Sequence, residues 1–439
     1  MNFLKFLFLL VSLQLCGQSG FEIEGNKKAV IPFQLINNLI FIPIEVNGVE
    51  LTFLLDTGVA ETLVFSLDDR EVNFNNIEKV TFSGLGESTE LEGLKAEGNE
   101  LSVQNMLDEN NTLYIILNAE INFSSHVGIP VHGIIGYHFF KNHQVEINYI
   151  SKKITAFPKD KSPSKLKRYA SFPITLELKK PYLYADIEMV NERKKSKMLV
   201  DLGNSDPVWL FPKLIEGFNY NRPNIDDYLG KGFNGDIFGK RSRIHGLYLG
   251  EFTFDKPVAA MPDEASIQHL KLVPDRKGSI GSGILRRFNV VFDYPNNQIL
   301  LKKNRNFSDP FLFNKSGLDI KHDGQQWENS IVEIRTTRRD AGDSSSLVFD
   351  ANENFRYSFV LKPLFSVAGC RKEAPCYSAG IRKGDKIISV NGKKAGDLSL
   401  EKIYNMLKAD EGSFVNMLIE RNGVEQKVKF ELKDPIPYQ

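Results

Sequence analysis

The amino-acid sequence predicts a mainly β protein with two duplicated β lobes and a smaller C-terminal domain. Short runs rich in Val, Ile, Leu and Phe alternate with polar turns, which is typical of strands. Three landmarks also recur with one spacing of 145 residues, which indicates a duplicated lobe rather than a short repeat. The matched landmarks are Asp56 with Asp201, Gly136 with Gly281, and Tyr149 with Tyr294.

Length and composition limit the possible functions. The chain has 439 residues, enough for two to four domains, and 42% of them are hydrophobic, which suffices for folded cores. Lys plus Arg and Asp plus Glu number 55 each, so the formal net charge is zero. The balance provides no basic field to attract nucleic acid or a membrane surface.

Residues 1–18 are typical of a signal peptide. Lys5 precedes an apolar run over residues 6–13, and small or polar residues follow at 16–19. We expect cleavage near residues 17–19 and a periplasmic or secreted protein without a transmembrane anchor. Acylation at Cys16 as a lipoprotein is the less favoured alternative, because the preceding Leu15 is bulky.

The first lobe is expected over residues 19–158. A β-hairpin over residues 39–55 turns at Asn47-Gly48, and its second strand ends at Asp56. Gly58 follows in a tight turn, where glycine has conformations that other residues avoid. A carboxylate placed at the end of an apolar strand is costly to bury, which favours a functional interpretation.

The second lobe is expected over residues 171–304, after a polar, proline-containing linker at 159–170. Its hairpin over residues 182–201 repeats the first and ends at Asp201. Each lobe also has a glycine-rich stretch that is either a mobile flap over a cleft or an ordinary hairpin turn. The flap candidates are Gly84, Gly86, Gly232 and Gly235.

Residues 305–352 are interpreted as a connector with one or two strands, and residues 353–435 as a compact C-terminal domain. In that domain, residues 400–407 have helical spacing with Ser399 as N-cap, and Asn422-Gly423 predicts a closing hairpin. Cys370 and Cys376 either form a small disulfide loop or remain two free thiols.

Two matched aspartates can meet where two lobes join. Two carboxyls in contact share a proton, so the ionised one can activate a water while the protonated one donates to a carbonyl oxygen. This chemistry hydrolyses an amide without a metal or a cofactor. The seven histidines fit no metal motif, so we expect neither a metal nor a cofactor in this protein.

Residues 29–303 resemble aspartic proteases of the pepsin and retropepsin type, which implies a bilobal β fold built here from one chain. The resemblance rests on residues 55–58 (Leu-Asp-Thr-Gly), residues 200–205 (Val-Asp-Leu-Gly-Asn-Ser) and the glycine elements at 134–136 and 279–281. It implies that a monomer suffices to build a cleft that binds a peptide or protein substrate.

The resemblance also implies a role for each motif residue. Asp56 and Asp201 would be the catalytic pair, supported by the residues of their two loops. The supporting residues are Thr57, Gly58, Gly203 and Ser205. Leu202 departs from the family, which has Thr or Ser there to brace the pair, and Ser279 replaces a usual apolar residue.

Residues 353–433 resemble a bacterial PDZ domain through residues 374–381 and the Gly384-Asp385 and Asn391-Gly392 turns. Such domains hold a peptide as an added strand, with its carboxylate at a loop of backbone N–H groups. The closest counterpart of that loop is residues 362–365, where Pro363 has no N–H. The groove candidates are Leu364, Phe365 and Val367.

The leading hypothesis is therefore an exported aspartic endopeptidase with a PDZ domain that docks peptides or proteins. A protease-like binding protein that lost efficient hydrolysis is the alternative, favoured by Leu202. A scaffolding role centred on the PDZ domain is a third possibility.

Overall fold

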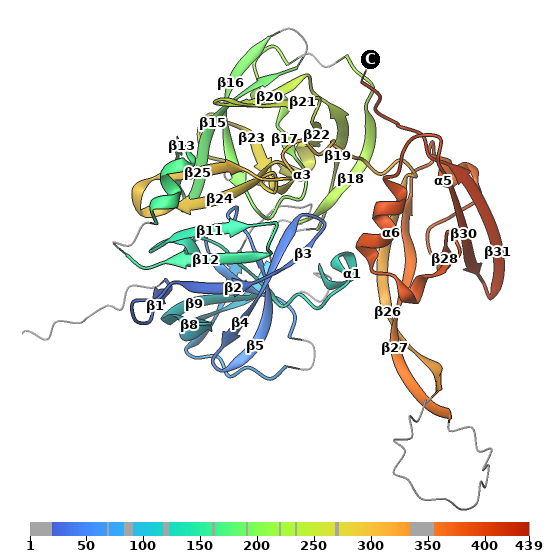
Figure 1. Ribbon diagram of the computed structural model, residues 1–439, viewed down its shortest axis with the longest axis horizontal. Coiled ribbons are helices and arrows are strands. Elements are labelled where there is room, and N and C mark those ends of the chain that lie inside the picture. Colours follow the sequence, from blue (N-terminus) through green and yellow to red (C-terminus); the bar gives the residue numbers. More distant parts are fainter. Residues whose placement is uncertain are drawn as a thin grey trace, which may run out of the picture. The chain divides into compact units, whose positions relative to one another are not determined.

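The computed structural model describes residues 20–67, 70–82, 91–116, 123–159, 163–189, 192–218, 221–232, 235–267, 272–333 and 355–438 (Figure 1). The chain divides into two compact units. The first comprises Met1–Ile121, Val131–Asn221 and Tyr228–Pro310, and the second comprises Asn122–Pro130, Arg222–Asp227 and Phe311–Gln439. The predicted signal peptide at residues 1–18, together with Gly84 and Gly86, lies outside the described residues.

The first sheet of the larger unit contains the hairpin that leads to Asp56. Its strand order is β1-β9-β6-β10-β5-β4-β8-β7, with β3 paired to β4. The strands are β1 (Glu22–Ile23), β3 (Gln34–Ile36), β4 (Leu39–Val46), β5 (Val49–Leu55), β6 (Thr62–Val64), β7 (Ile77–Phe82), β8 (Leu91–Val103), β9 (Met106–Ile116) and β10 (Gly133–Ile135).

A second sheet repeats this plan around Asp201. Its order is β18-β19-β22-β17-β23-β16-β15-β20-β21, with β14 paired to β15. The strands are β14 (Thr175–Glu177), β15 (Lys180–Glu188), β16 (Arg193–Asp201), β17 (Val208–Leu210), β18 (Ile225–Gly232), β19 (Gly235–Arg243), β20 (Gly246–Leu249), β21 (Phe252–Asp255), β22 (Val258–Pro262) and β23 (Arg276–Gly281).

The same local pairing occurs in both copies. In the first, β10 pairs parallel with β5 and antiparallel with β6. In the second, β23 pairs parallel with β16 and antiparallel with β17. A short helix follows the glycine strand each time, α2 (Tyr137–Phe140) after β10 and α4 (Ser282–Leu285) after β23. The 145-residue sequence repeat is therefore a repeat of structure, and the mainly β prediction is confirmed.

A third sheet joins strands of both copies in the order β13-β25-β24-β11-β12-β2 (Figure 1). β11 of the first copy pairs antiparallel with β24 of the second, and all of their central residues are buried. The strands are β2 (Ala29–Pro32), β11 (Gln144–Asn148), β12 (Lys153–Phe157), β13 (Ala170–Pro173), β24 (Phe288–Asp293) and β25 (Gln298–Lys303). This shared sheet fixes the two copies to each other within one unit.

The segment interpreted as a linker, residues 159–170, is packed in its described part. It contains the 3₁₀ helix η1 (Ser164–Arg168), whose Leu166 is buried. Lys165 and Tyr169 both bond to the Glu146 carboxylate, at 2.5 and 2.7 Å. A polar composition therefore did not indicate a free spacer here. The larger unit also contains η2 (Pro212–Leu214), α3 (Glu264–Ile267) and η3 (Tyr294–Asn296).

The smaller unit is a sheet in the order β26-β27-β28-β30-β31, with β29 paired to β28 and helices beside it (Figure 1). Its strands are β26 (Leu318–Glu333), β27 (Phe355–Cys370), β28 (Lys386–Val390), β29 (Lys393–Lys394), β30 (Phe414–Arg421) and β31 (Val424–Glu431). Its helices are α1 (Phe123–Val127), α5 (Pro375–Ser378), η4 (Ala395–Asp397) and α6 (Leu400–Leu407). Ser399 caps α6 as predicted, because its side chain accepts from the Lys402 N–H.

One boundary differs from the sequence interpretation. β26 lies inside the predicted connector, residues 305–352, yet it pairs with β27 along its length and contributes Leu318 and Ile320 to the core. The compact unit therefore includes residues from Phe311 onwards rather than from 353. The charged and polar residues of β26 hid its strand pattern, since residues 323–327 are exposed while Leu318 and Ile320 face the core.

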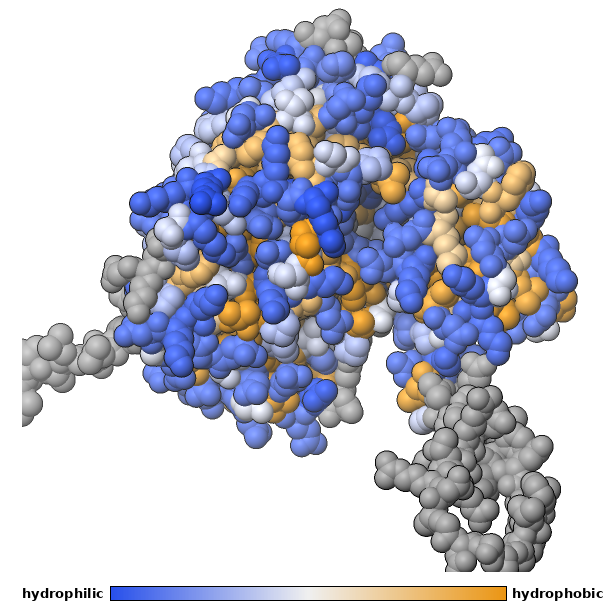
Figure 2. Space-filling view, viewed as in Figure 1, coloured by the Kyte–Doolittle hydropathy of each residue, from blue (hydrophilic) through white to orange (hydrophobic). Residues whose placement is uncertain are grey.

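The visible surface is mostly hydrophilic, with separate small apolar patches (Figure 2). Within the part of the chain that the structure describes, no helix has the length and apolar character that a membrane-spanning helix requires.

Candidate active site

Asp56 and Asp201 lie at equivalent places in the two copies and meet in the larger unit. Asp56 directly follows β5, and Asp201 is the last residue of β16. A Cβ on Gly203 would lie 2.2 Å from Asp56 Oδ2, and one on Gly58 would lie 3.0 Å from Asp201 Oδ1. The glycine of each loop therefore lies against the aspartate carboxyl of the other loop. The two carboxyls hydrogen bond to each other.

Gly136, which follows β10, and Gly281, which ends β23, pack against the backbone of the two loops. A Cβ on Gly136 would lie 2.0 Å from the Val59 carbonyl oxygen, and one on Gly281 would lie 2.2 Å from that of Asp206. Only glycine permits such close approach of backbone to backbone. The Asp56 N–H also donates to the Ile135 carbonyl at 2.8 Å, which fixes where β5 ends.

Thr57 bridges the two loops. Its hydroxyl donates to the Val200 carbonyl at 2.6 Å and accepts from the Leu202 N–H at 3.0 Å, and all of these groups are buried. Leu202, the counterpart of Thr57, is fully buried but has no hydroxyl with which to return these bonds. Its own carbonyl accepts from the Ser282 hydroxyl at 3.0 Å. The bracing is therefore one-sided, and it comes from the first copy.

The surroundings of the two carboxyls act differently on their pKa values. Burial, and next the charge of Asp201, raises the pKa of Asp56 to about 8. Burial also raises the pKa of Asp201, but Arg276 and Lys180 oppose that rise, and so does the hydrogen bond from Asp56. The nearby cations therefore favour the negative charge on Asp201 and the shared proton on Asp56, within one coupled pair.

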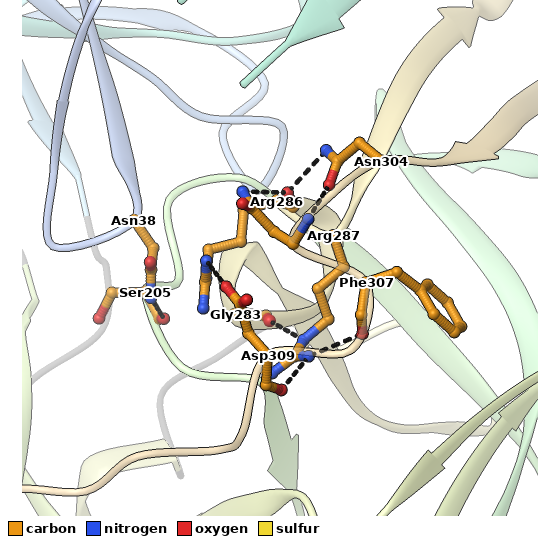
Figure 3. A network of polar contacts seen from close by, with 9 residues as sticks. Asn38, Ser205, Gly283, Arg286, Arg287, Asn304, Phe307 and Asp309 are labelled. Carbon is orange, nitrogen blue, oxygen red and sulfur yellow. Dashed lines mark hydrogen bonds and ion pairs between the residues drawn. The ribbon is translucent and has the colours of Figure 1, made fainter. Parts of the chain in front are cut away.

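Ser205 has a different contact from the one that the resemblance implies. Its main-chain carbonyl accepts from the Asn38 side chain at 3.0 Å, which ties the second loop to the first copy (Figure 3). The bonds to the Asp201 carboxyl come from Asp56 and from the Gly203 N–H. The proposed role of the Ser205 hydroxyl stays a prediction.

A buried arginine supports the second loop from further back. Arg287 is 2% exposed and donates to the carbonyls of Gly283, Phe307 and Asp309 (Figure 3). Gly283 in turn donates its N–H to the Asp206 carbonyl at 3.2 Å, within the loop that follows Asp201. The loop is therefore anchored to a chain segment about 100 residues further along.

The glycine-rich stretches occupy matching places in the two sheets. Gly232 is the last residue of β18 and Gly235 is the first of β19, so they flank the connection between two paired strands. Gly84 and Gly86 lie in the connection between β7 and β8, outside the described residues. The flap function of all four stays a prediction.

Two cations near the pair escaped sequence analysis. Lys180 begins β15 and Arg276 begins β23, and both carry charges that act on Asp201. Arg276 donates to the Ser279 hydroxyl at 2.9 Å, which gives the buried Ser279 side chain a partner. That hydroxyl, at a position where an apolar residue is usual, was the sequence signal that an internal polar partner existed.

In the smaller unit, two of the three predicted groove residues are core residues. Phe365 and Val367 are 3% and 1% exposed and pack with Leu318 and Ile320. Leu364 is half-buried. β26 pairs with β27, and its Ile320 N–H donates to the Tyr404 hydroxyl of α6 at 2.8 Å. The groove function of Leu364, Phe365 and Val367 stays a prediction.

Cys370 and Cys376 form a disulfide between the end of β27 and α5, with Cα atoms 6.5 Å apart. Among the described residues, no group of three His, Cys, Asp or Glu side chains has an arrangement that could hold a metal ion.

Comparison with known proteins identifies one part of the chain. Residues 367–421 match the family model of the PDZ domain. The chain contains a PDZ domain. The match begins inside β27 and ends at the last residue of β30, so it includes the end of β27 together with β28, β29 and β30.

A stretch of 62 residues is 32% identical to the carboxy-terminal processing protease CtpB of Bacillus subtilis. The similarity covers 14% of this chain and 13% of that protein. The similarity therefore links one part of this chain to one part of a protease.

Proposed function

We propose that this protein is an exported aspartic endopeptidase whose PDZ domain docks peptide or protein segments. The observation that carries the proposal is the contact between Asp56 and Asp201, which two matching loops bring together across the two copies. Each copy supplies one carboxyl, so one chain suffices to build the pair.

The two carboxyls have complementary roles in this proposal. Asp201, ionised beside two cations, takes a proton from a water bound between the pair, and the water oxygen attacks the scissile carbonyl carbon. Asp56 donates its proton to the carbonyl oxygen, which yields a neutral tetrahedral intermediate. The proton on Asp201 then passes to the leaving nitrogen, Asp56 recovers a proton from a hydroxyl of the intermediate, and the C–N bond breaks.

The PDZ domain has a separate role. Such domains bind extended peptides by adding a strand to a sheet edge. The partial similarity to a carboxy-terminal processing protease supports a role in peptide handling. We propose that the domain recruits a segment of the substrate, independently of the carboxyl pair.

Cleavage of an unstructured protein substrate tests the proposal. Asp56→Asn and Asp201→Asn should each lower the initial rate by about 1,000-fold or more, because each removes one proton-transfer partner. Asp255→Asn is the matched control, since Asp255 is 73% exposed on β21, and its rate should equal that of the wild type. Equal rates in all four proteins would contradict the proposal.

A peptide-binding protein without turnover is the second candidate, and the one-sided bracing at Leu202 favours it. In that case the wild type would bind peptides but release none as fragments from pH 3 to 8. Isothermal titration with reduced-amide peptides measures the binding, and mass spectrometry of the mixtures measures the fragments.

A further inference from the structure

The charges of Lys180 and Asp201 act on each other. β15 and β16 pair antiparallel, with Tyr182 opposite Leu199 and Leu183 opposite Met198. Lys180 precedes Tyr182 by two residues and begins β15, while Asp201 follows Leu199 by two residues and ends β16, so the register brings both to the same end of the strand pair. Since side chains alternate between faces, Lys180 and Tyr182 share a face with Leu199 and Asp201.

Arg276 approaches the same face from the other side of Asp201. β23 pairs parallel with β16, with Ser279 beside Leu199 and Gly281 beside Asp201. The Arg276 side chain folds back along its own strand and donates to Ser279 Oγ at 2.9 Å and to the Gly278 carbonyl at 3.2 Å. Its guanidinium also lies 5.0 Å from the centre of the Phe211 ring. All of these partners are neutral.

The local charges do not balance. Two carboxyls in contact share one proton, so the pair of Asp56 and Asp201 contributes one negative charge. Lys180 and Arg276 contribute two positive charges, and the charged groups that act on Lys180 are Arg276, Asp56 and Asp201. The nearby Glu177 cannot supply the balance, because it pairs with Lys197 at 2.5 Å. One positive charge is left over, and burial makes an uncompensated charge costly.

An apolar cluster lies next to the two cations. Tyr182, Leu199 and Val273 pack together and are 2%, 2% and 6% exposed. The face therefore combines buried apolar side chains with two basic side chains whose charges act on Asp201. This combination fits a ligand with a short apolar chain that ends in a carboxylate, since the ammonium and the guanidinium can both donate charge-assisted hydrogen bonds.

We propose that Lys180 and Arg276 form a subsite for a substrate carboxylate beside the scissile bond, so that this protein prefers acidic peptides. The inference deepens the proposed function and rests on it. The carboxylate belongs either to an Asp or Glu side chain or to the free C-terminus of a short peptide, and both fit the same two cations.

Matched peptides test the subsite. One set has Glu at a single position on either side of the scissile bond, a second has Gln there, and both have amidated C-termini. A third set is the Gln peptides with free C-termini. The wild type should cleave one Glu peptide about 10- to 100-fold faster than its Gln partner, as kcat/KM. A gain confined to the third set would assign the subsite to the terminal carboxylate.

Variants then assign the preference to the two residues. Lys180→Met and Arg276→Gln should each reduce the ratio of kcat/KM values toward one, and Arg276→Lys should retain part of it. Lys195→Met is the matched control. Lys195 is exposed on β16, on the same face as Asp201 and six residues or about 20 Å from it. The ratio of kcat/KM for the Glu and Gln peptides in this variant should equal that of the wild type.

Binding separates failure of the subsite from failure of the proposed enzyme. Non-cleavable reduced-amide versions of the Glu and Gln peptides are titrated into the wild type and into Lys180→Met. A wild-type preference for Glu that Lys180→Met abolishes supports the subsite even if no peptide is ever cleaved. Equal affinities for both peptides, or variants that shift the pH profile of cleavage while the Glu-to-Gln ratio stays unchanged, would overturn it.

Discussion

The two aspartate loops have the same backbone plan but different chemistry. The first loop provides Thr57, whose hydroxyl makes two bonds that join the loops. The second loop provides Leu202 at the matching position, and strands β15 and β23 of the same copy provide two cations, Lys180 and Arg276, whose charges act on Asp201. The first copy therefore braces the pair, while the second sets the local charge. The two copies therefore share a backbone geometry and differ in the side chains around their aspartates.

The two loop glycines offer the largest test of this comparison. A Cβ at position 203 would lie within 2.2 Å of Asp56 Oδ2, whereas one at position 58 would first meet an oxygen at 3.0 Å. Gly203→Ala should therefore push the carboxyls apart and lower kcat/KM by about 100-fold. Gly58→Ala should have a clearly smaller effect. Equal losses in the two variants would show that the loops tolerate displacement alike.

Removal of the one-sided brace should have the next largest effect. Thr57→Val keeps the shape of the side chain but leaves the Val200 carbonyl and the Leu202 N–H without their buried partner. We expect the free energy of unfolding of the larger unit to fall by about 2 to 4 kcal/mol. Urea unfolding followed by tryptophan fluorescence measures it. Thr57→Ser, which retains the hydroxyl, should lose much less.

The raised pKa of Asp56 predicts an unusual dependence of stability on pH. Because this pKa is about 8 in the folded protein and 3.8 in the reference state, the folded chain binds more protons between these values. The contribution of Asp56 to stability is therefore complete below about pH 4 and is lost as the pH rises to about 8. Titrating groups away from the pair are shared by the wild type and Asp56→Asn, so their difference reports the coupled pair of Asp56 and Asp201.

Thermal unfolding of both proteins from pH 4 to 8 measures that difference. The Tm of Asp56→Asn relative to the wild type should rise by about 10 °C across this range. Asp255→Asn, at an exposed position, provides the control for a lost carboxylate. A difference that stays constant with pH would contradict the assignment of the shared proton to Asp56.

Sequence reasoning reached the features that depend on local pattern. Strand ends at Asp56 and Asp201, the glycines behind them and the capped helix α6 follow from apolar runs and turn residues. It missed Lys180 and Arg276, because their approach to Asp201 depends on the register of β15 and β23 against β16. It did not place β26 in the C-terminal domain, because the polar residues of that strand concealed its pairing with β27.

Leu202→Thr tests whether the asymmetry of the loops limits activity, and its expected effect is the smallest. A hydroxyl at position 202 can return the bonds that Thr57 now makes alone, which should raise kcat/KM by about threefold, an effect of less than 1 kcal/mol. Leu202 is fully buried, so the smaller side chain should also cost about 1 to 3 kcal/mol of stability. Leu202→Val shares the loss of volume without the hydroxyl, and it should lose stability without any gain in rate. If both variants change the rate equally, packing at this position rather than the missing brace controls the pair.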